Sequence, residues 1–164
     1  MSGGDTASRW AVPALIVLAT AATAALGAAA SIDAQAYYAS LKQPAWAPPA
    51  WLFGPVWTTL YVMMALAACL IVRRLGLPAA RPALALYAVQ LVLNALWTWL
   101  FFRWHQGALA SVEVLLLLAA IVLTARAFWR AVPLAGWLLV PYMAWVTFAS
   151  ALTIAVWRLN PTML

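Results

Sequence analysis

Charged residues are scarce in this sequence. Its 164 residues include nine Lys or Arg and three Asp or Glu, so charged side chains make up 7% of the chain, whereas 68% of the residues are hydrophobic. Water-soluble domains carry about 25% charged and about 45–50% apolar residues. The shortage of charge therefore excludes an ordinary water-soluble domain and indicates a protein dissolved in lipid.

Residues that commonly bind metals or act as nucleophiles are also scarce. Cys69 is the single cysteine and His105 the single histidine, so the sequence allows neither an intrachain disulfide nor a metal cluster of cysteines. No serine stands in a pattern with histidine and a carboxylate that suggests a catalytic triad. The basic residues are spread over helix ends and loops rather than along one stripe. The sequence thus predicts no metal site, no required cofactor and no nucleic-acid partner.

Long apolar segments, in contrast, are abundant. Five of them approach the roughly 20 residues that span a bilayer as a helix. We predict an all-α integral membrane protein, a compact single-domain bundle of five transmembrane helices in which short connections make consecutive helices antiparallel neighbours. The first segment is longer than the apolar region of about 7–15 residues in a cleaved signal peptide, which favours a helix. The predicted helices cover about residues 11–31, 50–72, 82–102, 107–127 and 133–157, with a lid loop at about 32–49.

The positions of the basic residues predict the orientation in the membrane. Six Lys or Arg flank the spans on the side of the N-terminus, and three flank them on the opposite side. Lys and Arg accumulate in cytoplasmic loops. We therefore expect a cytoplasmic N-terminus, with the C-terminus and the first loop on the outer face of a bacterial cell membrane.

The segment from Pro44 to Trp57 is rich in tryptophan and proline. It holds three tryptophans and four prolines in fourteen residues. Proline removes backbone donors and fixes φ, so the segment can be stiff without being a regular helix. Each indole offers a large flat face and one N–H donor. We interpret the segment as a lid over a binding site for a large planar molecule.

The third predicted helix carries polar residues on one face. Gln90, Asn94 and Thr98 recur at i+4 spacing, with Tyr87 and Trp97 close to the same face. Such a stripe avoids lipid, because an unpaired polar group in hydrocarbon costs several kcal/mol. Gln90 either joins helices through hydrogen bonds or lines a cavity. For Asn94 we favour the cavity.

Depth along the helices brings candidate residues of three helices to one level. At a rise of 1.5 Å per residue, Trp57, Asn94 and Ala149 each lie about 10–12 Å into their helices from the side of the lid. Helical spacing places aromatic side chains on the same faces. We therefore predict an aromatic pocket at this level. The aromatic neighbours are Tyr61, Tyr142 and Trp145.

Two further features of the spans have structural interpretations. Glu113 begins the fourth predicted helix, and we expect it to pair with Arg103 or His105 in the preceding short loop. Pro141 is expected to kink the fifth helix and to open space beside Tyr142. With so few acidic residues in the spans, a proton relay has little support.

Several motifs together resemble the TspO family, the tryptophan-rich sensory proteins also called translocator proteins or peripheral-type benzodiazepine receptors. The resemblance covers nearly the whole chain after the first dozen residues, and the order and spacing of the motifs agree with it. The most specific motifs are Tyr37-Tyr38, Lys42 to Pro49, Gly54 to Trp57, Gln90 to Trp97 and Pro141 to Trp145.

The resemblance implies a five-helix bundle, commonly a homodimer in membrane lipid, with a pocket below the first loop that binds porphyrins such as protoporphyrin IX or heme. It also implies that Trp57 and Trp145 take part in porphyrin binding and, if degradation occurs, act as the catalytic residues of a light-dependent breakdown. The family's pocket positions correspond by motif to Tyr38, Trp46, Asn94 and Ala149. Together with the aromatic neighbours identified above, the candidate ligand-binding residues are Tyr38, Trp46, Trp57, Tyr61, Asn94, Trp97, Tyr142, Trp145 and Ala149.

Three functions remain open from the sequence. The first is a porphyrin-binding receptor or transporter, and the second is an enzyme that degrades porphyrin with light and oxygen. The third is a structural membrane protein that binds lipid or sterol. The family's sterol-recognition pattern needs a basic residue close after a tyrosine, but Tyr142 has no Lys or Arg within five residues. We therefore favour porphyrin over sterol.

Overall fold

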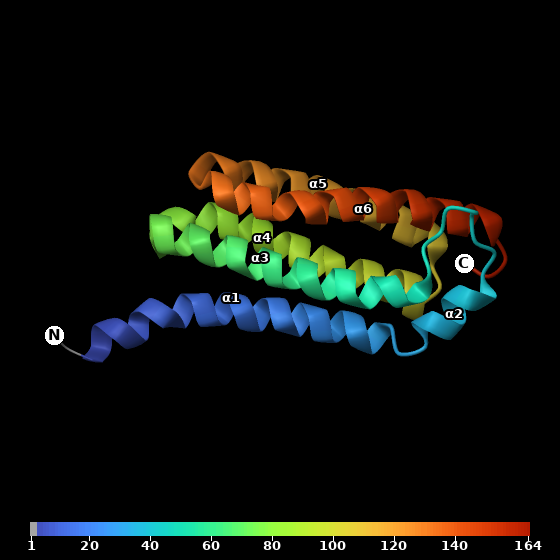
Figure 1. Ribbon diagram of the computed structural model, residues 1–164, viewed down its shortest axis with the longest axis horizontal. Coiled ribbons are helices and arrows are strands. Elements are labelled where there is room, and N and C mark those ends of the chain that lie inside the picture. Colours follow the sequence, from blue (N-terminus) through green and yellow to red (C-terminus); the bar gives the residue numbers. More distant parts are fainter. Residues whose placement is uncertain (1–2) are drawn as a thin grey trace.

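The computed structural model describes residues 3–164, with side chains from Trp10 onward, and this part of the chain is helical without strands (Figure 1). Five long helices are apolar enough to cross a membrane. The predicted all-α membrane bundle is thus confirmed. The long helices are α1 (Gly3–Ala30), α3 (Phe53–Leu75), α4 (Leu77–Thr98), α5 (Gly107–Ala131) and α6 (Pro133–Leu159).

The bounds of several segments differ from the prediction. The lid, predicted as loop throughout, contains the short helix α2 (Ala34–Ser40), and the first residues predicted for the second long helix form the 3-10 turn η1 (Ala50–Leu52). α2 forms because its residues lack proline and are mostly good helix formers. α4 begins at Leu77, five residues before the predicted start, directly after Gly76, whose φ of 75° ends α3. At its other end α4 continues into the π-helical turn η2 (Trp99–Arg103).

The long helices form three layers (Figure 1). α3 and α4 lie in the middle, α5 and α6 cover one side of them, and α1 lies along the other side. α5 and α6 form the tightest pair. Near their connection, a Cβ built on Gly136 would lie 2.7 Å from Cβ of Trp129 and 2.8 Å from its Cα, so only glycine allows this approach.

α1 is the most loosely held of the five helices. In its span 22% of the residues are buried inside the protein, against 50% in α5. The half of α1 next to the lid, from Ala21 to Ala30, consists mostly of alanine. Small side chains bury little apolar area and therefore contribute little to packing.

The lid is fastened to the C-terminal end of the chain. The side chain of Asn160 accepts a hydrogen bond from the backbone N–H of Lys42 at 2.9 Å and donates one to the carbonyl of Lys42 at 2.9 Å. The ring of Tyr37 stacks on His105, with centroids 4.1 Å apart. These contacts hold α2 over the end of the bundle where α1 finishes and α3 begins.

Candidate functional site

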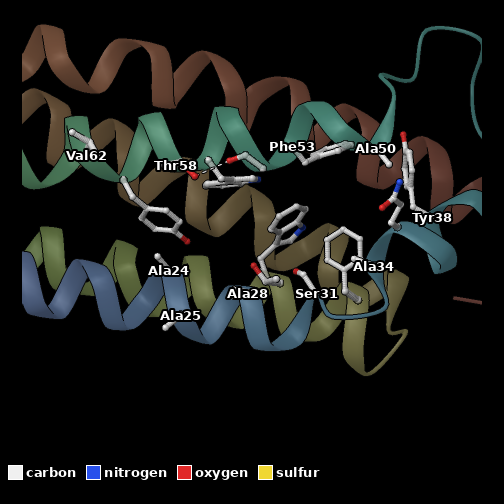
Figure 2. A pocket seen from close by; sticks show the side chains of 18 residues that line it. Ala24, Ala25, Ala28, Ser31, Ala34, Tyr38, Ala50, Phe53, Thr58 and Val62 are labelled. Atoms are coloured by element: carbon white, nitrogen blue, oxygen red, sulfur yellow. Dashed lines mark hydrogen bonds between the residues drawn. The ribbon is translucent and has the colours of Figure 1, made fainter.

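A cavity of about 670 Å³ lies between α1, α3 and α4, with α2 across its end (Figure 2). Ligand pockets for small molecules have volumes of about 300–1,000 Å³ and are mostly apolar. The cavity therefore has the size and chemistry of a binding site for an apolar small molecule. Its aromatic lining residues are Tyr38, Phe53, Trp57, Tyr61, Trp97 and Phe102.

Three rings form the inner wall of this cavity. The ring of Trp57 lies 5.7 Å from Tyr61 and 6.1 Å from Trp97, with interplanar angles of 34° and 35°. α3 supplies Trp57 and Tyr61 at i and i+4, so both face the same way. α4 supplies Trp97 from the neighbouring helix. The three rings together present a broad aromatic surface to the cavity.

The opposite wall belongs to α1, which the sequence did not predict to take part. Ala24, Ala25, Gly27 and Ala28 line the cavity from this helix, and Figure 2 shows Ala24 and Ala28 on the side of α1 that faces the rings. Their small size leaves the space that the cavity occupies. An alanine-rich helix carries no sequence signal of a binding site, which is why α1 was missed.

Two polar groups at the cavity wall lack a hydrogen-bond partner. They are the hydroxyl of Tyr38 and the indole N–H of Trp97, both buried and unpaired within residues 3–164. Burial raises the pKa of the Tyr38 phenol, so at neutral pH it remains a donor. An unpaired buried donor costs about 1–3 kcal/mol. Both groups are therefore suited to meet an acceptor on a bound molecule after a small side-chain movement.

Behind the aromatic wall, four polar side chains form a connected network. The Tyr61 hydroxyl donates to Oδ1 of Asn94 at 2.6 Å, and Nδ2 of Asn94 donates to the Tyr142 hydroxyl at 3.0 Å. The Tyr142 hydroxyl in turn donates to Oε1 of Gln90 at 2.9 Å. Asn94 therefore joins α3, α4 and α6 and does not line the cavity, contrary to our expectation. For Gln90, the interpretation as a helix-joining residue is the one the structure supports.

The α6 candidates do not line the cavity, although the ring of Tyr142 meets that of Trp57 edge-on at 6.1 Å. Ala149 and Tyr142 are buried in the core, with 4% and 0% of their surface exposed. Trp145 packs against Phe53, 5.8 Å away, and against Phe148, 5.6 Å away. Tyr142 does not line the cavity, although Pro141 lies inside α6 as predicted.

Trp46 belongs to the group of aromatic residues around Trp145, namely Phe53 and Phe148. Its ring meets Phe148 edge-on at 5.7 Å, and half of its surface is exposed. Phe53 connects the group to the cavity, because it lines the cavity and also contacts Tyr38 at 5.5 Å. Of the nine candidates, four line the cavity, Asn94 and Tyr142 belong to the network, Trp46 and Trp145 pack around Phe148, and Ala149 is buried in the core. Those that line the cavity are Tyr38, Trp57, Tyr61 and Trp97.

The predicted ion pair of Glu113 is wrong. Glu113 is buried, and neither carboxylate oxygen has a hydrogen-bond partner in the described part of the chain. His105 stacks on Tyr37 instead, and Arg103, expected in the short loop, ends the π-helical turn η2. Within the described residues no three His, Cys, Asp or Glu side chains gather to hold a metal ion.

Comparison with known proteins decides the family. A sequence model described as the TspO/MBR family matches residues 14–158. The chain belongs to this family. Its TspO relatives include Protein CrtK from Rhodobacter capsulatus, 41% identical over 152 residues that cover 90% of this chain and 92% of the relative. The Homo sapiens Translocator protein is 42% identical over 126 residues, covering 76% and 75%. The Tryptophan-rich sensory protein of Cereibacter sphaeroides is 38% identical over 151 residues, covering 92% of each chain.

Proposed function

We propose that this TspO-family protein binds a porphyrin, such as protoporphyrin IX or heme, in the cavity between α1, α3 and α4, as a receptor or transporter. The observation that carries the proposal is the aromatic wall of Trp57, Tyr61 and Trp97 beside an apolar space of about 670 Å³. Flat aromatic ligands stack favourably on such rings. The apolar face of α1 accommodates the opposite face of the macrocycle.

The unpaired donors suit the polar edge of the same ligand. A porphyrin carries propionate groups at one edge, and charge-assisted hydrogen bonds to carboxylates are about twice as strong as neutral ones. The Tyr38 hydroxyl lies at the α2 end of the cavity and has no partner among the described residues. Propionates directed toward α2 would accept from Tyr38 and remain near water, while the macrocycle lies deeper against Trp57.

The orientation that we propose places this α2 end at the outer face of a bacterial cell membrane. Arg73 and Arg74 end α3 and Arg81 lies near the start of α4, at the same end of the bundle as the start of α1. Excess Lys and Arg mark the cytoplasmic side. Fusions of alkaline phosphatase and of a fluorescent protein to the C-terminus test this orientation, because only the phosphatase is active on the outer side.

The test of porphyrin binding is an equilibrium titration of the purified protein with protoporphyrin IX in the dark, followed by the porphyrin absorption band. We expect saturable binding at micromolar porphyrin. Trp57→Phe should weaken it at least threefold, because the smaller ring stacks less area. Trp137→Phe is the matched control, since Trp137 is 58% exposed near the α5–α6 connection. Equal affinity of both variants, or unsaturable binding by the wild type, contradicts the proposal.

A light-dependent porphyrin-degrading enzyme is the second candidate function. It would use Trp57, whose indole lies 6.1 Å from that of Trp97 and so belongs to a pair of oxidisable rings at the cavity. Trp145 contacts Phe53 rather than the cavity, so the two tryptophans first suggested do not face one ligand together. Loss of the porphyrin spectrum under illumination, with repeated turnover, would favour the enzyme over the binding protein.

A further inference from the structure

The cavity is open along its side. Val62 lines it from α3 and is 56% exposed, and Thr58 and Gly54, one and two turns earlier on the same face, are also exposed. On α1, Ala25 and Ala28 line the cavity and are exposed as well. Figure 2 shows Ala24 and Ala28 on α1 and Thr58 on α3 on the two sides of the cavity. The space between α1 and α3 is therefore not closed by side chains.

This opening lies at the depth of the hydrocarbon core. Val62 is about 14 Å along α3 from its start at Phe53, and Ala24 is about 9 Å from the end of α1, at 1.5 Å per residue. Half of a bilayer's hydrocarbon thickness is about 15 Å. In the membrane the opening thus faces acyl chains rather than water.

The end of the cavity that faces water is covered and fastened instead. Ala34, Gln35 and Tyr38 of α2 lie across it. The two hydrogen bonds between Asn160 and the backbone of Lys42 tie the lid to the end of α6. A large ligand entering from water would have to break these contacts, whereas the lateral opening requires only that acyl chains move aside.

We infer that the opening between α1 and α3 is a lateral portal through which an apolar ligand dissolved in the bilayer enters the cavity. The inference rests on the proposed function, and it adds that the ligand class is a membrane-partitioned amphiphile delivered from the lipid phase. α1 is the helix that yields when a large ligand passes, because 22% of its span is buried against 50% in α5. Small residues on both edges keep the portal wide. Widening it needs no change in the α5–α6 pair.

A pair of neighbouring threonines provides a matched test. Thr58 and Thr59 are both exposed and each donates to the carbonyl four residues earlier at 2.9 Å, but only Thr58 lines the cavity. On α1, Ala25 lines the cavity and exposed Ala22 does not. A phenylalanine at Thr58 or Ala25 should narrow the portal, whereas the same residue at Thr59 or Ala22 should only face lipid.

The experiment measures association and dissociation rates of protoporphyrin IX by stopped-flow mixing with protein in phosphatidylcholine vesicles. We expect Thr58→Phe and Ala25→Phe to lower both the association rate and the dissociation rate at least fivefold, because a narrowed portal slows entry and exit alike. A side chain that only fills the cavity would weaken binding without slowing dissociation. The association and dissociation rates of Thr59→Phe and Ala22→Phe should stay within twofold of the wild-type rates. Asn160→Ala releases the lid, and its association and dissociation rates should also stay within twofold of the wild-type rates. Faster rates in Asn160→Ala with unchanged portal variants would overturn the inference in favour of entry through the lid.

A second readout does not depend on porphyrin. With a phosphatidylcholine that carries a diazirine at its acyl tail, illumination should label Tyr61, which lines the cavity, and Thr58→Phe should reduce that label at least threefold. An unlabelled Tyr61 overturns the portal even if porphyrin binds, whereas a labelled Tyr61 without saturable porphyrin binding supports the portal and contradicts the proposed ligand. If the portal variants change the oligomeric state in detergent and leave all rates unaltered, the opening is a surface between two copies of the chain and the inference fails.

Discussion

The buried hydrogen-bond network offers the sharpest prediction about stability. Tyr142→Phe removes one hydroxyl and changes little else in shape. That hydroxyl accepts from Asn94 at 3.0 Å and donates to Gln90 at 2.9 Å, so the variant loses two hydrogen bonds. Interhelical hydrogen bonds in membrane proteins contribute about 0.6 kcal/mol on average and about 1.7 kcal/mol at most. We expect the free energy of unfolding to fall by about 1–3 kcal/mol.

Because the partners of the Tyr142 hydroxyl are buried, we expect the loss of unfolding free energy to lie in the upper part of this range. Asn94 and Gln90 are each 1% exposed, so neither amide can turn to water when the hydroxyl is removed. The other contact of the Gln90 amide is a long one, from Nε2 to the sulfur of Met64 at 3.8 Å. Leaving buried polar groups unpaired is more costly than the mean value of the bond itself.

Two tyrosine variants calibrate the measurement. Tyr61→Phe removes a single hydrogen bond, to Asn94 at 2.6 Å, and should cost about half as much as Tyr142→Phe. Tyr37→Phe removes a long, exposed hydrogen bond of 3.4 Å to the carbonyl of Met163, so it should leave the free energy of unfolding nearly unchanged. The assay is unfolding in mixtures of dodecyl maltoside and dodecyl sulfate, followed by helicity. If Tyr142→Phe is no less stable than Tyr37→Phe, the network does not join the helices as described.

Further variants test individual packing statements. Glu113→Gln should leave the thermal midpoint unchanged or raise it, because the carboxylate has no partner in the described residues; a clear fall would indicate an ion pair, for example with Arg103. Gly136→Ala should cost about 1–3 kcal/mol of unfolding free energy, since its Cβ would lie 2.8 Å from Cα of Trp129, whereas Gly54→Ala, which meets nothing within 4 Å, should be neutral or slightly stabilising. Equal stability of the two alanine variants would contradict the described contact of α5 with α6.

The five spans could be predicted from the sequence because they depend on local composition. A run of about 20 apolar residues must form a helix in lipid, where no water satisfies the backbone. The start of α4 was placed five residues too late because Arg81 lowers the hydropathy without disfavouring a helix. The short helix α2 was missed because seven residues between two turns give a weak periodic signal.

The cavity could be predicted only in part. Trp57, Tyr61 and Trp97 stand out because aromatic side chains at helical spacing indicate a shared face, and the structure places all three at one cavity. Which helix lies opposite them depends on tertiary packing. Depth along a helix gives the level of a residue but not the direction in which it points, so Ala149 was assigned to the pocket although it is buried in the core.

The polar residues illustrate the same limit. The i+4 spacing of Gln90 and Asn94 predicts a common face that avoids lipid, and both are buried. Whether such a face meets a cavity or another helix depends on which helix packs against it in the folded bundle. Here Tyr142 of α6 supplies a hydroxyl between the two amides. A tyrosine 48 residues away in sequence from Asn94 gives no local signal of that contact.

We propose that porphyrin binds between α1, α3 and α4, and a larger side chain on α1 that fills this space tests the proposal. A Cβ on Gly27 would face the Tyr61 hydroxyl at 3.7 Å and Oγ1 of Thr98 at 3.8 Å, so a leucine there projects into the cavity. The quantity to measure is the dissociation constant of protoporphyrin IX for Gly27→Leu and for the lipid-facing control Ala22→Leu. We expect at least tenfold weaker binding for Gly27→Leu and less than a twofold change for Ala22→Leu. Wild-type affinity in Gly27→Leu would contradict it and place any bound porphyrin elsewhere on the protein.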